Sequence, residues 1–155
     1  MKAVFVLDLD GVLTDGKFYY SIEGKLLKSF GPDDNDALQE ISNFLEVVVI
    51  SADTNGFEIS RRRVENDMKL ELYNVGSLER IKWIRDRYEG YFKIYMGDGF
   101  YDHLVFNEVD LAIAPANASE RAKASADFIT KRSGGDRAVA EACVRIASTI
   151  FNSDI

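Results

Sequence analysis

Two aspartates that lie two positions apart follow an apolar stretch near the start of the chain. Residues 4–16 are VFVLDLDGVLTDG, in which Asp8 and Asp10 precede Gly11. Because residues i and i+2 of a strand face the same side, both carboxylates can reach one point at the strand's end. Carboxylates this close repel each other unless a cation or a proton is shared between them, and Gly11 lets the backbone turn close to a ligand. The stretch therefore indicates a binding site.

More carboxylates follow a second apolar run, in the sequence GDGFYD at positions 97–102. Asp98 comes at the end of this predicted strand, and Asp102 lies one helical turn further on. Asp98 can therefore approach the point that Asp8 and Asp10 reach. Several carboxylates with no histidine or cysteine beside them favour a hard, oxygen-liganded ion such as Mg²⁺ over zinc.

A third apolar run, VVVIS, ends at Ser51. The Ser51 hydroxyl and the backbone N–H groups of Ala52 and Asp53 would lie at the same rim of the sheet. Hydroxyl and N–H groups are the donors that bind phosphate oxygens. We therefore expect a phosphate site next to the predicted Mg²⁺ site.

The elements that must position these residues alternate between apolar strands and amphipathic helices. The predicted strands cover residues 3–9, 46–51, 70–75, 92–98, 109–114 and 126–130. The predicted helices cover residues 36–45, 57–67, 78–88, 101–108, 119–124 and 137–151. This alternation predicts an α/β fold with a Rossmann-like, doubly wound parallel sheet and helices on both faces. Ligands bind such sheets at the carboxyl ends of the strands.

One segment, residues 16–31, departs from the alternation. Its alternating apolar residues around Glu23 and Gly24 predict a β-hairpin inserted after the first strand, at about residues 17–30,. A lone hairpin is marginally stable unless its apolar side packs on something. The apolar hairpin side chains could face this domain or a neighbouring subunit. The length favours one domain, residues 1–155,.

Composition excludes several functional classes. The net charge of −7 argues against a nucleic-acid partner, which normally requires a basic face. No apolar run reaches the roughly 18 residues of a membrane span, so we expect no membrane partner. The single cysteine, Cys143, and the lack of a cleavable leader pattern favour a reducing, cytoplasmic location.

The three motifs DLDGVLTDG, VVVIS and GDGFYD, at successive strand ends, together resemble those of the haloacid dehalogenase superfamily of aspartate-nucleophile phosphatases. The resemblance implies that Asp8 attacks phosphorus and that Asp10 serves first as general acid and then as general base. It also implies that Mg²⁺ is held by Asp8, Asp98 and the backbone carbonyl of Asp10, with Asp102 in support.

The segments between the motifs leave no room for a cap domain. The hairpin and the late segment ADFITKRSGGDRAVAEACVRI resemble the capless, tetrameric 3-deoxy-D-manno-octulosonate 8-phosphate phosphatases. In that group hairpins assemble the tetramer. The resemblance implies a Mg²⁺-dependent phosphomonoester hydrolase of a phosphorylated sugar acid, working as a homotetramer. Two alternatives remain: a phosphatase of nine-carbon ulosonate 9-phosphates, or a weakly active or non-catalytic scaffold of the same fold.

Some positions depart from the family pattern. Superfamily members carry a lysine near the start of the third helix that offsets the charge of the nucleophile and the phosphate. It aligns with Arg80, and Lys82 lies two residues later, so either could take that role. In SGGDRAV, Asp136 stands where the family has arginine, and Arg137 where it has glycine. Candidate substrate contacts are therefore Arg137, Arg61 in SRRRVEND, and Asp34 in FGPDDND. The alternatives for Arg61 and Asp34 are a solvated helix face and a helix N-terminus.

Overall fold

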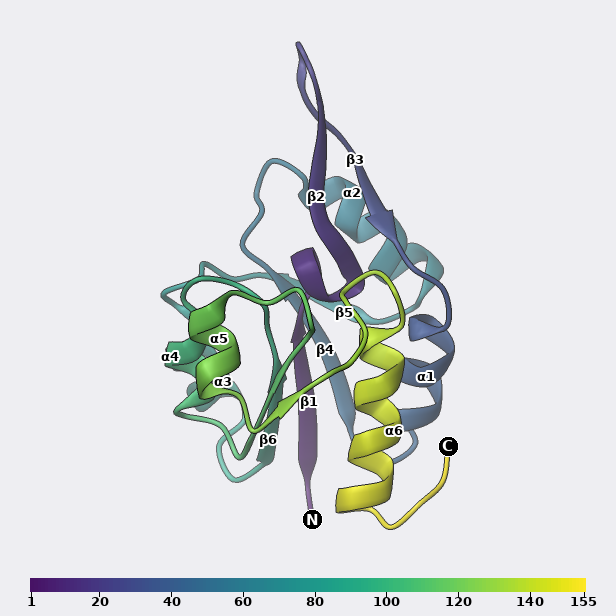
Figure 1. Ribbon diagram of the computed structural model, residues 1–155, viewed down its shortest axis with the longest axis vertical. Helices are drawn as coiled ribbons and strands as arrows, with labels where there is room; N and C mark the ends of the chain where they lie inside the picture. Colours follow the sequence, from purple (N-terminus) through teal and green to yellow (C-terminus); the bar gives the residue numbers. More distant parts are fainter.

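A six-stranded, entirely parallel sheet forms the centre of the protein (Figure 1). The computed structural model describes residues 1–155. In spatial order the strands are β5 (Glu71–Asn74), β4 (Glu46–Ser51), β1 (Ala3–Asp8), β6 (Phe92–Met96), β7 (Leu111–Ala114) and β8 (Phe128–Ile129). Chain order therefore runs outward from β1 to one edge and then from β6 to the other. This is the doubly wound order, with its switch point beside β1, and the predicted fold class is confirmed.

Strand β1 is buried on both faces because its sequence is apolar at every position before Asp8. Phe5 and Leu7 belong to one hydrophobic cluster, whereas Val4 and Val6 belong to the other. Alternate side chains of a strand point to opposite faces, so β1 contributes side chains to the hydrophobic clusters on both faces of the sheet. A strand buried on both sides ends with its last residue fixed in position, and here that residue is Asp8.

Helices cover both faces of the sheet. One face is covered by α1 (Asp34–Ile41) and α6 (Ala138–Ile150), which pack against each other, together with the turns η2 (Arg62–Asp67) that continue α2 (Phe57–Arg61). The other face is covered by α3 (Arg80–Arg87), α4 (Asp102–Phe106) and α5 (Glu120–Ser125). The predicted helix over 57–67 is thus an α-helix followed by looser turns.

The antiparallel hairpin of β2 (Thr14–Ser21) and β3 (Gly24–Phe30) projects beyond the carboxyl ends of the sheet (Figure 1). Its turn pairs Ser21 with Gly24, whose φ is +123°. The predicted hairpin around Glu23 and Gly24 is therefore present, and its first strand begins earlier than expected. No cap domain is present.

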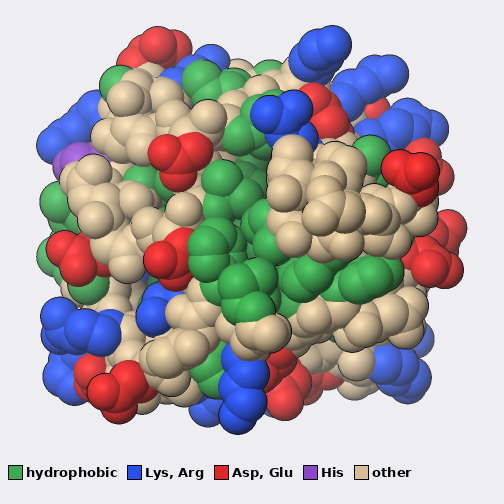
Figure 2. Space-filling model, turned by 90° about the horizontal axis from the view of Figure 1, so that it is seen from below, with side chains coloured by type: hydrophobic (Ala, Val, Ile, Leu, Met, Phe, Trp, Pro, Cys, Tyr) green, Lys and Arg blue, Asp and Glu red, His purple; other side chains and the backbone are tan.

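Charges of both signs are interspersed around apolar side chains on the face away from the hairpin (Figure 2). This face therefore carries no basic stripe. The helices are all too short or too polar to cross a membrane.

Candidate active site

A cavity of about 300 Å³ lies at the carboxyl ends of the central strands, beside the base of the hairpin. It is lined by Asp8, Asp10, Gly16, Phe18, Ala52, Asp53, Ser77, Arg80, Asp98 and Gly99. A larger hollow of about 500 Å³ lies on the outer side of α3 around Trp83, but no converging carboxylates line it. We place the site in the smaller cavity because the predicted carboxylates meet there.

The turn after β1, η1 (Leu9–Leu13), has no space for a side chain at Gly11. Gly11 has a φ of +83°, and a Cβ atom there would lie 1.8 Å from Oδ2 of Asp98. Only glycine adopts this conformation without strain and allows the carboxylate so close. The Thr14 hydroxyl accepts the N–H of Gly11 at 3.1 Å, and Asn117 donates to its carbonyl at 3.0 Å. These contacts fix the turn against Asp98.

Asp8, Asp98 and Asp102 form the acidic centre of the site, with carboxylate oxygens that lie within 4.8 Å of one another. Arg80, the first residue of α3, contacts both oxygens of Asp8 at 3.0 and 3.2 Å, and Oδ1 of Asp102 at 3.0 Å. The Tyr95 hydroxyl accepts from Arg80 at 2.8 Å and donates to Asp102 at 2.7 Å. One guanidinium therefore contacts two of the three acids, Asp8 and Asp102, and the Tyr95 hydroxyl.

Burial raises the pKa of Asp8 from 3.8 to about 7, against the opposing effect of Arg80. Burial also raises the pKa of Asp98 to about 8, with further increases from the charges of Asp8 and Asp102. Carboxylates with raised pKa values indicate a site with too little positive charge. The all-oxygen donor set and this missing charge fit a hard divalent cation such as Mg²⁺.

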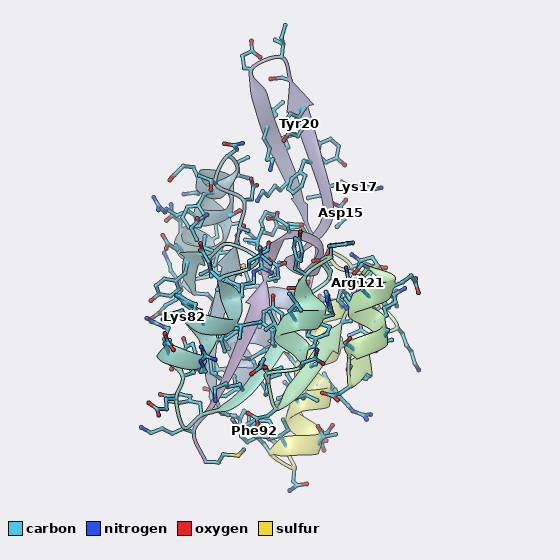
Figure 3. All side chains as sticks on the ribbon, turned by 90° about the vertical axis from the view of Figure 1, so that its left-hand side faces the viewer. Asp15, Lys17, Tyr20, Lys82, Phe92 and Arg121 are labelled. Carbon is cyan, nitrogen blue, oxygen red and sulfur yellow. The ribbon has the colours of Figure 1, made fainter.

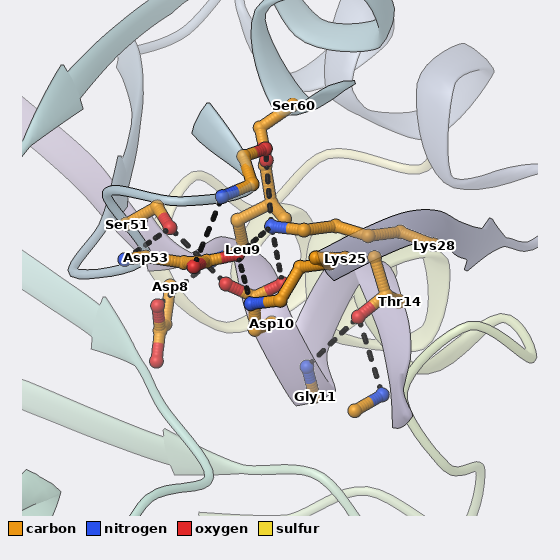
Figure 4. A network of polar contacts seen from close by, with 12 residues as sticks. Asp8, Leu9, Asp10, Gly11, Thr14, Lys25, Lys28, Ser51, Asp53 and Ser60 are labelled. Atoms are coloured by element: carbon orange, nitrogen blue, oxygen red, sulfur yellow. Dashed lines mark hydrogen bonds and ion pairs between the residues drawn. The ribbon is translucent and has the colours of Figure 1, made fainter. Parts of the chain in front are cut away.

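Asp10 faces the opposite side of the cavity, toward the hairpin (Figure 4). Its Oδ2 accepts from the Ser51 hydroxyl at 3.1 Å, and its Oδ1 lies 2.8 Å from Nζ of Lys28. Ser51, fully buried at the end of β4, also accepts the N–H of Asp53 at 3.1 Å. The Ser51 hydroxyl, predicted to bind phosphate, is therefore used to hold Asp10 and the loop after β4, while Ala52 lines the cavity.

Lys82 does not reach the carboxylates. Its side chain is 77% exposed and pairs with Asp86 on the outer face of α3 (Figure 3). Arg80 and Lys82 therefore point to different sides of one helix, and Arg80 is the basic residue that the structure brings to the site.

The three predicted substrate contacts lie outside the cavity lining. Arg61 is half-exposed and pairs with Glu58 and Glu65 along its own helical segment. Arg137 precedes α6 and pairs with Asp33 at 2.6 Å.

Asp34, the third of these predicted contacts, is 3% exposed and accepts the N–H of Ala140 at 2.9 Å, so it joins α1 to α6. Asp34 therefore makes a buried contact between two helices and does not line the cavity.

Lys25 and Lys28 of the hairpin were not predicted. Three positions apart, they would face opposite sides of a regular strand. Tyr19 pairs with Leu27 and Tyr20 with Lys25, so Leu26 is an extra residue on β3. This β-bulge turns both lysines to the same side, where Lys25 lies 2.6 Å and Lys28 2.9 Å from Oδ2 of Asp53.

The sheet order and the carboxylates at its switch point are those expected of a phosphatase that resembles the haloacid dehalogenase superfamily, and the comparisons with known proteins agree. The chain is 29% identical over 149 residues to 3-deoxy-D-manno-octulosonate 8-phosphate phosphatase KdsC of Escherichia coli K12, covering 90% of this chain and 76% of that protein. No protein-family model matches it.

Two solved structures are similar along nearly the whole chain. One is the 3-deoxy-D-manno-octulosonate 8-phosphate phosphatase of Moraxella catarrhalis in complex with a magnesium ion, a phosphate ion and KDO. It has a TM-score of 0.80 at 26% identity and covers 97% of this chain and 88% of that one. The other is described as a subfamily III A hydrolase of the haloacid dehalogenase superfamily from Legionella pneumophila, with a TM-score of 0.83 at 26% identity over 95% of this chain and 82% of that one. These similarities support a phosphatase of the haloacid dehalogenase superfamily that resembles KdsC.

Proposed function

We propose that this protein is a Mg²⁺-dependent phosphomonoester hydrolase that acts through an aspartyl-phosphate on a phosphorylated sugar acid such as 3-deoxy-D-manno-octulosonate 8-phosphate. One observation carries the proposal. Asp8 lies on the cavity floor with both oxygens held by Arg80, next to Asp98 and across from Asp10. The relative bound to Mg²⁺, phosphate and KDO supports both the ion and the substrate class.

Asp8 and Asp98 would hold the Mg²⁺ ion together with the backbone carbonyl of Asp10, and Asp102 would support them. The carboxylates of Asp8, Asp98 and Asp102 already converge, whereas the Asp10 carboxylate is engaged by Lys28 and Ser51. Bound Mg²⁺ would screen the repulsion between the nucleophilic carboxylate and the phosphate oxygens.

In the proposed reaction, an Asp8 oxygen attacks phosphorus while the bond from phosphorus to the leaving oxygen breaks. The protonated Asp10 gives its proton to that oxygen, which leaves as an alcohol. Asp10, now a carboxylate, accepts a proton from the water that attacks the phosphorus of the aspartyl-phosphate. Inorganic phosphate and free Asp8 result, and Asp10 is protonated again. Arg80 is placed to orient Asp8 and to bind phosphate oxygens.

The hairpin supports a homotetramer. Apolar side chains on it are widely exposed: Tyr20 is 66%, Ile22 100% and Leu27 56% exposed. Clustered exposed apolar residues mark interaction surfaces. We therefore propose a single-domain chain, residues 1–155, that assembles through this hairpin and works in the cytoplasm, where its one free cysteine, Cys143, stays reduced,.

The test is a screen of phosphorylated sugars, including the eight- and nine-carbon ulosonate phosphates, with Mg²⁺ or with EDTA. We expect Mg²⁺-dependent release of phosphate, with the highest kcat/KM for the eight-carbon compound. Asp8→Asn should lower kcat by at least about 10⁴-fold because the nucleophile is lost. A higher kcat/KM for the nine-carbon compound would favour the alternative substrate. Mg²⁺ binding without turnover would favour a scaffold, and light scattering would test the tetramer.

A further inference from the structure

We infer that Lys28 is a positioning residue that fixes the carboxyl group of Asp10, which in its protonated form gives a proton to the leaving oxygen. The inference deepens the proposed function and rests on it, because it concerns the residue to which that reaction assigns the proton. It makes the hairpin part of the catalytic apparatus of its own chain.

The ammonium group of Lys28 is enclosed by three polar neighbours from different segments (Figure 4). Its Nζ lies 2.8 Å from Oδ1 of Asp10 and 2.9 Å from Oδ2 of Asp53, and it donates to the Ser60 hydroxyl at 2.8 Å. The side chain of Lys28 is 0% exposed. The ammonium group therefore makes one hydrogen bond, to Ser60, and lies between two carboxylates that it contacts as ion pairs.

Lys25 contacts only part of this network. Its Nζ pairs with Asp53 at 2.6 Å and lies 3.6 Å from the ring centroid of Phe18, which lines the cavity. Burial opposes ionisation of Asp53, but hydrogen bonds from Lys25 and Lys28 lower the pKa of Asp53 overall. The ionised Asp53 therefore anchors Lys28, while Lys28 alone of the two lysines touches Asp10.

Two side-chain contacts hold the Asp10 carboxylate, one at each oxygen: Lys28 lies at Oδ1 and the Ser51 hydroxyl donates to Oδ2. The backbone there is extended, with φ −74° and ψ 123° at Asp10, and Gly11 follows at φ +83°. Lys28 carries a full positive charge whereas the Ser51 hydroxyl is neutral, so Lys28 attracts the Asp10 carboxylate more strongly and is the main determinant of its direction.

The test compares substrates that differ in their need for a proton. A p-nitrophenolate group leaves without protonation, whereas the alkoxide of a sugar phosphate leaves only with help from a general acid. We expect Lys28→Met to lower kcat on the sugar phosphate by at least about tenfold more than on p-nitrophenyl phosphate, because part of a general acid effect of roughly 10²–10⁴ is lost. KM should change little for either substrate.

Lys17→Met is the matched control, because Lys17 is exposed on the same hairpin and makes no ion pair (Figure 3). It should keep the wild-type ratio of kcat on the sugar phosphate to kcat on p-nitrophenyl phosphate. Lys28→Arg retains the charge with a different shape, so its ratio should lie between those of wild type and Lys28→Met. Circular dichroism melting and light scattering would establish that each variant is folded and assembled.

If Lys28→Met does not fold, Ser60→Ala tests the same network by removing one contact of the ammonium group, and it should lower the ratio in the same direction. A wild-type ratio in every folded variant at positions 28 and 60 would overturn the inference while leaving the proposed function intact. A wild-type protein inactive on both substrates would overturn the proposed function and the inference with it.

Discussion

Asp8 and Asp10 are two positions apart in the chain, but the structure surrounds them differently. Asp8 is held by Arg80 at the start of α3, next to Asp102 of α4, which Tyr95 of β6 contacts. Asp10 is instead held by Lys28, from the inserted hairpin. The proposed nucleophile is therefore fixed by helices and a strand of the α/β core, whereas the proposed acid and base is held by the inserted hairpin.

The two surroundings also differ in charge. Around Asp8, three carboxylates face one guanidinium. Around Asp10, the carboxylates of Asp10 and Asp53 face the ammonium groups of Lys25 and Lys28. The first set has an excess of negative charge and suits a divalent cation, while the second is balanced. The carboxylates proposed to hold the metal and the carboxyl group proposed to transfer the proton thus lie on separate sides of one cavity.

The largest effect should follow removal of Arg80. In Arg80→Met, Asp8 and Asp102 stay buried without their cation, which costs about 3–5 kcal/mol of unfolding free energy. We expect kcat to fall by about 10²–10³-fold, and to a similar extent on sugar phosphate and p-nitrophenyl phosphate. This equal loss contrasts with the selective loss expected for Lys28→Met. Urea unfolding and steady-state kinetics on both substrates would measure it.

Arg85→Met is a suitable control because Arg85 lies on the same helix with a side chain that is 66% exposed. It should leave both kinetics and stability nearly unchanged. A loss of kcat in Arg80→Met that is confined to the sugar phosphate would show that Arg80 acts with Asp10 rather than with Asp8. The proposed difference between the surroundings of Asp8 and Asp10 would then be wrong.

A smaller effect concerns pH and Mg²⁺. The pKa values of Asp8 and Asp98 are raised from 3.8 to about 7 and about 8, so the folded state binds their protons more tightly than the unfolded state does. Their contribution to the free energy of unfolding is fully present below the pKa of the unfolded state and is lost as pH rises through 7 and 8. In EDTA, the free energy of unfolding should therefore fall by at least about 1 kcal/mol between pH 6 and pH 8.

Mg²⁺ should restore more of that stability at pH 8 than at pH 6, because it competes with protons for the same carboxylates. Asp98→Asn should abolish this Mg²⁺ effect, whereas Asp10→Asn should retain it, since the Asp10 side chain lies outside the acidic centre. Equal Mg²⁺ effects in the two variants would argue against the separation of the two sides.

Much of the Asp8 side could be predicted from sequence because its signals are local. Apolar runs that end in aspartate predict Asp8 and Asp98 at one edge of a parallel sheet, and in the structure their carboxylates lie close together. The choice between Arg80 and Lys82 depended on which helix face is buried. A signal for it exists, since Arg80 lies four residues before buried Ile84 whereas Lys82 lies four before exposed Asp86,.

The Asp10 side could not be predicted in the same way. The hairpin itself was visible from its alternation and its glycine turn. The bulge at Leu26 was not, and without it Lys25 and Lys28 fall on opposite faces. The position of Asp34 was hidden for a similar reason, because its partner, the N–H of Ala140, lies 106 residues away in the chain. Contacts of this kind depend on how the elements pack, not on local pattern.

The smallest effect on activity should come from Asp34→Asn, which lies on neither side of the cavity. Burial raises the pKa of Asp34 from 3.8 to about 6, so its contribution to stability is lost as pH rises through 6. The amide does not titrate, and it keeps an acceptor for Ala140. Asp34→Asn should therefore gain stability relative to wild type between pH 5 and pH 7.5, by about 1–3 kcal/mol, with kcat/KM within about twofold of wild type because no Asp34 atom reaches the cavity. Urea unfolding at the two pH values and steady-state kinetics would measure both quantities.

A loss of kcat/KM beyond about tenfold would instead place Asp34 in a substrate site. The surroundings of Asp8 and Asp10 would then not make up the whole active site.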